Sequence, residues 1–152
     1  MRLFFILIFF LFLMGSCSQC DPTNKIGGEV IDGVIVRIID AYIEGPTLVT
    51  NPFQLQPWSS SAYIPAEMRL TTELEYIPVD FSKYSIVGVP TTASCSSGYE
   101  RIIDFDDFNN VVHYTINITE CPTCDGVSTI QNWVLIPRVA SDYIVEVDIN
   151  YQ

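Results

Sequence analysis

Apolar and polar residues alternate with a period of two in three segments of this chain. The segments cover residues 68–76, 112–119 and 143–151, and in each of them one set of alternate positions is mainly apolar. A period of two over eight or nine residues predicts a β-strand. One apolar and one polar face is typical of strands in antiparallel sheets.

Further segments also predict strands. Residues 29–42 are rich in Val and Ile in both phases, which favours a strand covered on both faces. Weaker patterns occur at 84–89, 99–105 and 130–140, and Pro137 places the last of these at a sheet edge or a bulge. About seven strands predict an all-β fold, a single antiparallel β-sandwich that is immunoglobulin-like or similar.

The connection at residues 44–66 carries four prolines and a run of three serines. Long connections of this kind are often functional. Its aromatic side chains, Phe53, Trp58 and Tyr63, suit either a ligand platform or packing of the connection onto the core, and we favour packing.

The first residues have the pattern of a secretory signal. Arg2 precedes an apolar run from Phe4 to Met14, and small residues follow. As a helix this run of about eleven residues is about 17 Å long, against a hydrocarbon core of about 30 Å. Removal of the segment is therefore favoured over its retention as a membrane span.

The residues Met14-Gly15-Ser16-Cys17 resemble the bacterial lipobox, which implies that Cys17 is lipidated and becomes the new N-terminus. Attachment of two or more acyl chains, such as palmitate, suffices for a stable anchor. The expected organisation is a lipoprotein signal peptide at 1–16, a lipidated tether at 17–28 and a β-sandwich domain at 29–152. Conventional cleavage after Ser16 or Ser18 is the alternative.

Charge narrows the range of partners. Without the signal segment the chain has 18 acidic and six basic residues. Such a protein repels nucleic acid and anionic headgroups, so we expect no nucleic-acid partner. The charge is also explained by solubility alone.

Four cysteines follow the expected lipid site: Cys20, Cys95, Cys121 and Cys124. An even set in an exported chain predicts disulfides, and sequence leaves three pairings open. We favour Cys121 with Cys124 and Cys20 with Cys95, a pairing that ties the tether to the domain. The Cys121-Pro122-Thr123-Cys124 motif also suits a redox pair, but it lies between two predicted strands and not at a helix N-terminus.

The sequence gives little support for a metal site or for a catalytic motif. Cys95, Cys121, Cys124 and His113 suit a Cys3His zinc set, although only one Cys-x-x-Cys is present. The acidic segment 104–110 lacks the glycine and glutamate of a calcium loop. The chain has no Gly-x-Ser-x-Gly, no His-Glu-x-x-His and no phosphate loop. We therefore expect no metal, no cofactor and no enzymatic activity.

The lipobox, Cys20 and the segment Ala93-Ser94-Cys95-Ser96-Ser97-Gly98-Tyr99 together resemble a group of small lipoproteins of the Bacteroidota type. In that group a mid-chain cysteine precedes a tyrosine-containing turn, a strand and an Asp-Phe-Asn-like segment, similar to residues 102–109 here. The resemblance implies an exported protein that is lipid-anchored in the outer membrane, on its periplasmic or surface face. It implies no particular activity.

Together these observations favour a non-enzymatic binding or assembly module of the cell envelope. Its expected partners are the membrane, through the lipid anchor, and an envelope protein or glycan met through the 44–66 connection or a sheet edge. The rival hypothesis is an envelope thiol-disulfide protein that uses Cys121 and Cys124.

Overall fold

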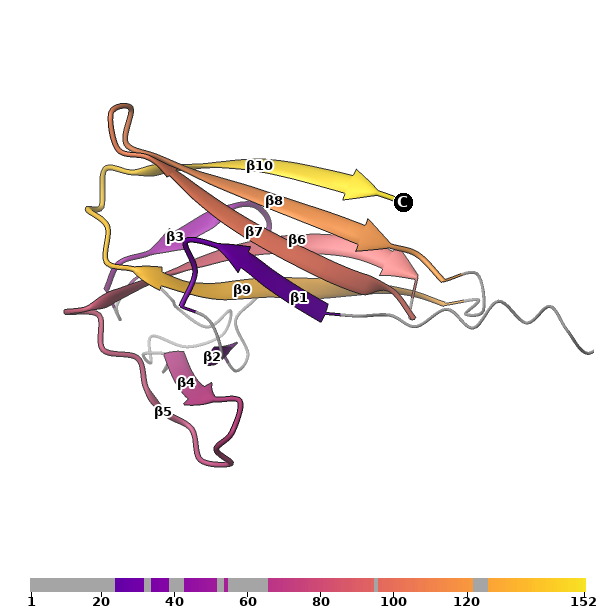
Figure 1. The fold of residues 1–152 in the computed structure, drawn as a ribbon, viewed down its shortest axis with the longest axis horizontal. Coiled ribbons are helices and arrows are strands. Elements are labelled where there is room, and N and C mark those ends of the chain that lie inside the picture. Colours follow the sequence, from indigo (N-terminus) through magenta and orange to yellow (C-terminus); the bar gives the residue numbers. More distant parts are fainter. Residues whose placement is uncertain are drawn as a thin grey trace, which may run out of the picture.

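A computed structural model describes residues 24–31, 34–38, 43–51, 54, 66–94, 96–121 and 126–152. These ranges contain strands and no helix, which confirms the all-β expectation (Figure 1). The strands are β1 (Asn24–Gly28), β2 (Val34–Ile38), β3 (Thr47–Val49), β4 (Ala66–Leu70), β5 (Ile77–Pro78), β6 (Tyr84–Ser94), β7 (Gly98–Asp106), β8 (Val111–Thr119), β9 (Val127–Pro137) and β10 (Ile144–Tyr151).

The strands form three sheets. The first sheet has the order β1-β7-β8-β10, the middle sheet β3-β6-β9 and the outer sheet β2-β4-β5. The expectation of one antiparallel sandwich of about seven strands was too simple, because the described ranges contain ten strands. The first sheet is also mixed, since β1 runs parallel to β7 and β10 parallel to β8. Neither pair is joined by a hairpin, so no tight turn forces an antiparallel direction.

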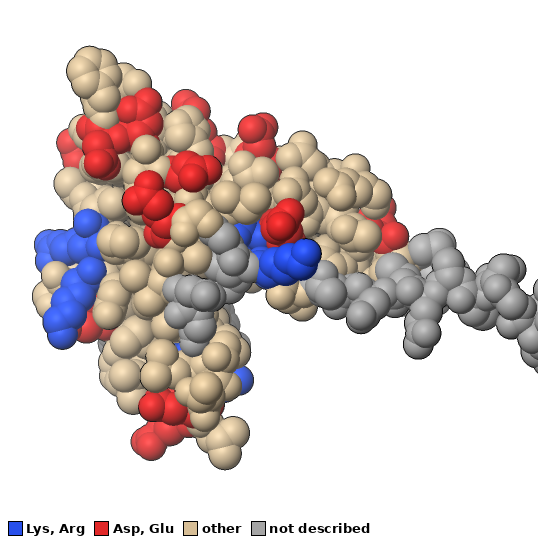
Figure 2. Space-filling view, viewed as in Figure 1, with Lys and Arg blue, Asp and Glu red and all other residues tan. Residues whose placement is uncertain are grey.

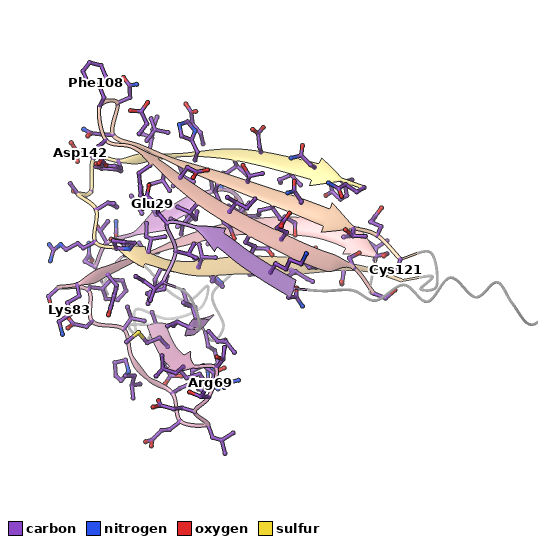
Figure 3. All side chains as sticks on the ribbon, viewed as in Figure 1. Glu29, Arg69, Lys83, Phe108, Cys121 and Asp142 are labelled. Atoms are coloured by element: carbon purple, nitrogen blue, oxygen red, sulfur yellow. The ribbon has the colours of Figure 1, made fainter. Side chains whose placement is uncertain are left out.

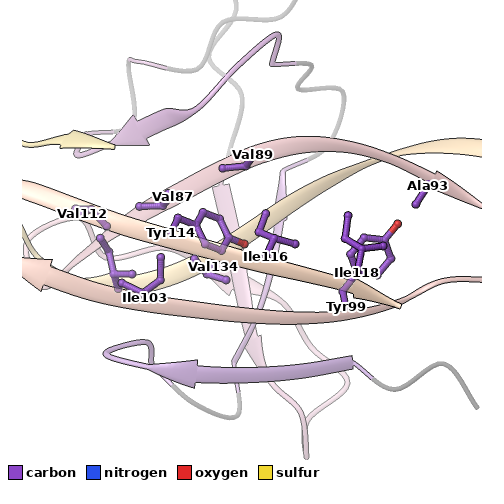
Figure 4. Packing of buried hydrophobic residues seen from close by; sticks show 11 residues of the cluster. Val87, Val89, Ala93, Tyr99, Ile103, Val112, Tyr114, Ile116, Ile118 and Val134 are labelled. Atoms are coloured by element: carbon purple, nitrogen blue, oxygen red, sulfur yellow. The ribbon is translucent and has the colours of Figure 1, made fainter. Parts of the chain in front are cut away.

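The middle sheet is buried on both faces. Val87, Val134 and Ile136 belong to a core cluster shared with the first sheet (Figure 4). Their neighbours Ile86 and Leu135 belong to a second cluster shared with the outer sheet. Successive residues of a strand point to opposite faces, so β6 and β9 must be apolar in both phases to serve both clusters.

Several predicted strands are confirmed. Alternate residues of β8 are fully buried, as the 112–119 pattern predicts; they are Val112, Tyr114, Ile116 and Ile118. β6 pairs with β9 over eleven residue pairs, from Tyr84 with Pro137 to Ser94 with Val127. β9 is an edge strand of the middle sheet, as Pro137 predicts.

The expected strand at 68–76 was wrong beyond Leu70. The chain turns there, and the Glu73 amide donates a hydrogen bond of 3.0 Å to the Leu70 carbonyl. Leu74 is 97% exposed at this turn. The alternation therefore continues through a turn that brings β5 back beside β4.

Of the expected strand at 29–42, the described residues form β2 at 34–38, whereas residues 29–31 lie outside any strand. β1 lies in the segment expected as tether, and Gly28 ends it with a φ of 75°. The Glu29 amide then bonds to Ile103 of the first sheet, and the Ile31 amide bonds to Leu135 of the middle sheet. The chain thus crosses between sheets before it enters β2. The connection expected at 44–66 also contains a strand, β3.

Candidate functional site

A cavity of about 570 Å³ lies among residues of β1, β7, β9 and β2. It therefore touches all three sheets, along the side where the first sheet ends in β1 and the middle sheet ends in β9. Its lining residues are Asn24, Val34, Ile35, Val36, Thr71, Ser97, Tyr99, Arg101, Ile130, Gln131 and Trp133.

Arg101 occupies a core-facing position of β7. Tyr99 and Ile103, two residues before and after it, are 2% and 0% exposed and belong to the core cluster between the first and middle sheets. Because side chains two apart share a face, Arg101 points between these sheets as well. The strand thus places a cation at a position where apolar side chains are the rule.

Uncharged groups surround the Arg101 guanidinium. Its Nε donates a hydrogen bond of 2.9 Å to Oδ1 of Asn132, and its centre lies 5.0 Å from the centroid of the Tyr99 ring. It also bonds the Tyr114 hydroxyl. Burial lowers the pKa of Arg101, and no carboxylate of the described residues forms an ion pair with it.

The Arg101 contacts belong to a buried polar network. Asn132 is 1% exposed, and its Nδ2 donates to the Thr91 hydroxyl at 2.8 Å and to the Val89 carbonyl at 3.2 Å. The Tyr114 hydroxyl donates to the Asn132 carbonyl at 3.4 Å, and burial raises the pKa of Tyr114. This network fixes the guanidinium in place without neutralising its charge.

Two further polar atoms beside the cavity have no hydrogen-bond partner among the described residues. They are Oε1 of Gln131 and the hydroxyl of Tyr99, and both are buried. Buried polar atoms are nearly always paired in folded proteins. These two atoms are closed off from solvent, so the charged group that the described lining offers is the Arg101 guanidinium.

Trp133 forms an apolar wall of the same cavity. It stands opposite Gly88 in the β6–β9 register. A Cβ on Gly88 would lie 2.0 Å from the nearest atom of the Trp133 ring, so the ring lies directly over this glycine. Because Gly88 has no side chain, it leaves the space that the Trp133 indole fills, and we call this space the Trp133 seat.

The cavity differs in charge from the rest of the protein. The full chain has 18 acidic and seven basic residues, yet the described residues of the lining include one Arg and no Asp or Glu. Acidic side chains instead gather around the β7–β8 turn at one end of the face shown in Figure 2.

Of the five predicted cysteines, the structure describes Cys121. It is 1% exposed and disulfide-bonded. Cys17, Cys20, Cys95 and Cys124 lie outside the described residues, as do Phe53, Trp58 and Tyr63.

The surroundings of Cys121 bear on its pairing. Its carbonyl accepts hydrogen bonds from the hydroxyls of Ser94 at 3.4 Å and Ser96 at 3.5 Å. These serines flank Cys95 in the sequence, so the contacts favour Cys95 as the partner over Cys124. Both pairings remain predictions.

The candidate zinc ligands His113 and Cys121 are not brought together. His113 lies on the exposed face of β8, with Nδ1 3.4 Å from Oε2 of Glu146. Cys121 follows the far end of the same strand, about 25 Å away at the rise of an extended chain. A disulfide-bonded sulfur also offers no thiolate to a metal. The described ranges contain no cluster of three metal-ligating side chains.

The acidic segment 104–110 forms a closed turn. The Asp106 carboxylate accepts hydrogen bonds from the backbone amides of Phe108 and Asn109, both at 3.1 Å, and from the Asn109 side chain at 2.7 Å. These bonds, the side-chain bond above all, lower the pKa of Asp106. Phe108 stands 95% exposed at the tip, at the opposite end of the molecule from Cys121 (Figure 3). The Asp106 carboxylate thus stabilises the turn.

Sequence reasoning did not find the cavity. A signal for Arg101 exists, because it interrupts the apolar phase formed by Tyr99, Ile103 and Phe105 in β7. A cation in a core-facing phase indicates either a buried network or a binding site. No comparable signal shows that Trp133 and β2 would lie beside it.

Comparisons with known proteins add no identity: no protein-family model, no curated protein and no solved structure matches this chain. Within the described residues we find no helix capable of spanning a membrane.

Proposed function

We propose that this protein is an exported, lipid-anchored and non-enzymatic binding module of the cell envelope, which binds a carboxylate-bearing ligand through Arg101. The observation that carries the proposal is the lining of the cavity. Among the described residues that line it there is one guanidinium and no acid, in a chain where acids outnumber bases 18 to seven.

The physical chemistry of the guanidinium supports an anionic ligand. A partly buried charge without a counter-charge is unfavourable, so a ligand that supplies the counter-charge gains affinity. A carboxylate matches the forked N–H groups of arginine with two parallel hydrogen bonds, and its single charge balances that of one guanidinium. The aromatic rings of Tyr99 and Trp133 would cover the apolar part of such a ligand.

We further propose that the first and middle sheets form the immunoglobulin-like sandwich expected from the sequence. They contribute seven strands, and the larger core cluster draws on both. The outer sheet is then an added layer that closes one side of the cavity.

The proposed anchor suits the course of β1. Asn24 pairs with Tyr99, and Gly98 pairs with Thr119, so β1 begins at the end of the first sheet that leads to Cys121. A tether from Cys17 would therefore attach at this end and leave the β7–β8 turn pointing away from the membrane. The support for lipidation itself is the sequence around Cys17.

The binding proposal is tested by NMR titration of the purified protein with N-acetyl-L-aspartate, with N-acetyl-L-asparagine as the uncharged control. We expect saturable shifts of the Arg101 Nε–H and Trp133 indole signals with the acid alone. Arg101→Met should abolish the shifts, and Arg101→Lys should weaken them, because lysine keeps the charge but loses the fork. Equal responses to acid and amide, or no response, would refute the proposal.

The anchor proposal is tested separately by intact mass and membrane partitioning, beside Cys17→Ala. We expect a diacylglycerol-sized mass increment that disappears in the variant. A soluble protein without the increment would contradict the anchor and leave the cavity proposal unaffected.

The rival thiol-disulfide function would require an accessible sulfur. Reactive cysteines are partly exposed, whereas Cys121 is 1% exposed. We expect Cys121 to resist reduction and alkylation until the fold opens. Rapid reduction of the native protein, followed by alkylation of Cys121, would favour the rival.

A further inference from the structure

β9 is an edge strand whose hydrogen-bonding direction follows from bonds at its C-terminal end. The Arg138 amide bonds toward β6, to the Lys83 carbonyl at 3.0 Å. The Leu135 carbonyl points the other way and accepts from the Ile31 amide at 2.9 Å. In an antiparallel strand both backbone groups of a residue point to the same side, so odd-numbered residues of β9 point away from β6.

Four residues of β9 therefore direct their N–H and C=O groups outward before the contact with Ile31. They are Val127, Thr129, Gln131 and Trp133. In the described part of the chain no backbone group bonds to them. An unpaired row of this kind is a template for a further strand.

The free edge and the cavity coincide. Gln131 and Trp133 belong both to the outward-pointing set and to the cavity lining, and Ile130, which directly precedes Gln131, lines the cavity as well. Val127, at the start of the same edge, is 74% exposed. A chain that pairs with β9 would therefore run past Arg101.

We propose that the cavity and the β9 edge form one site for an extended peptide, which joins the middle sheet as a fourth strand and places an acidic side chain on Arg101. This inference rests on the proposed carboxylate site and names its ligand class. The ligand should carry an acidic residue because its charge complements that of Arg101. It should have an extended backbone because the unpaired edge of β9 can pair with a strand.

The geometry also defines the sequence pattern of the ligand. Side chains of a strand alternate between faces, so residues flanking the acidic position would face Trp133 and the outer sheet. Those residues should be apolar, since Val34 and Val36 line the cavity there. The free edge from Val127 to Trp133 accommodates about six residues.

The test uses the purified protein in detergent micelles and the acetylated, amidated peptide Thr-Val-Asp-Val-Thr-Val. We expect it to bind at least about tenfold more tightly than N-acetyl-L-aspartate, because backbone bonds are added. The amide protons of Thr129, Gln131 and Trp133 should exchange more slowly with solvent in the complex. Two further versions of the peptide are N-methylated, one at the odd and one at the even positions, so that each loses the N–H groups of one edge. Because only one edge of the peptide would pair with β9, only one of the two versions should lose affinity.

Thr129→Pro is the matched variant of the protein. It removes one outward N–H and the hydroxyl bond to Thr92, and it leaves the backbone bonds to β6 intact. Proline is tolerated at such edge positions. We expect about a tenfold loss of peptide affinity, with the N-acetyl-L-aspartate response unchanged. Thermal unfolding of the variant reports separately on its fold.

Several results would overturn the inference alone. They are a peptide affinity equal to that of N-acetyl-L-aspartate, equal binding of both methylated peptides, or a dimer in which β9 pairs with β9 of a second copy. In each of these cases the carboxylate response at Arg101 would still stand. If neither the peptide nor N-acetyl-L-aspartate binds, the proposed function fails as well.

Discussion

Substitution of Gly88 by alanine tests how the wall of the cavity is built. The new Cβ would lie 2.0, 2.2 and 2.7 Å from three atoms of the Trp133 ring, so the indole must leave its seat. Overpacking of this kind costs about 1–3 kcal/mol. Exposure of about 100 Å² of indole adds about 2.5 kcal/mol at 25 cal/mol per Å². Partial relaxation lowers the sum, and we expect a loss of about 3 kcal/mol in the free energy of unfolding.

The measurement is urea and thermal unfolding of four proteins: wild type, Gly88→Ala, Trp133→Ala and the double variant. A loss of about 3 kcal/mol corresponds to a fall in Tm of about 10 °C for a domain of this size. In the Trp133→Ala background the same Gly88→Ala change should stabilise by about 0.5–1 kcal/mol, because glycine weakens a strand interior. If the effect of Gly88→Ala on stability changes sign when the indole is absent, the Trp133 ring is the cause of the loss.

Gly45 supplies the control, because a Cβ placed there meets nothing within 4 Å. Gly45→Ala should therefore change stability by no more than about 0.5 kcal/mol. Our account of the Trp133 seat is refuted if Gly88→Ala matches this control, or if its effect is the same with and without the indole.

Three further predictions follow from local geometry. Gly28→Ala should speed amide exchange across β1 and destabilise by about 2 kcal/mol, because Gly28 has a φ of 75° and its Cβ would lie 2.0 Å from a backbone oxygen. The Asp80 pKa is lowered from 3.8 to about 2 by hydrogen bonds from a serine and a lysine, so Asp80 stabilises the fold above pH 4. That contribution is lost as the pH falls through about 2, and Asp80→Asn should flatten the stability profile there. Non-reducing peptide mapping should join Cys121 to Cys95, and a bridge from Cys121 to Cys124 would contradict this pairing.

The local alternation of residues determined much of the fold. The apolar phase of residues 112–118 predicts the buried face of β8, and Pro137 predicts that β9 lies at an edge. A charged residue in the apolar phase of β7 is also visible in the sequence. These features depend on neighbours along the chain, because alternate residues of a strand lie on the same face.

Only the tertiary structure decided what lies opposite each face. The parallel directions of β1 and β10, the third sheet and the turn after Leu70 all depend on partners far along the chain. Arg101 becomes a candidate site because β9 and β2 approach it, and because the described residues of the cavity lining include no acid. Alternation does not show which strands become neighbours. The sequence pattern alone therefore showed that Arg101 interrupts the apolar phase of β7, but it could not show that a cavity lies beside this residue.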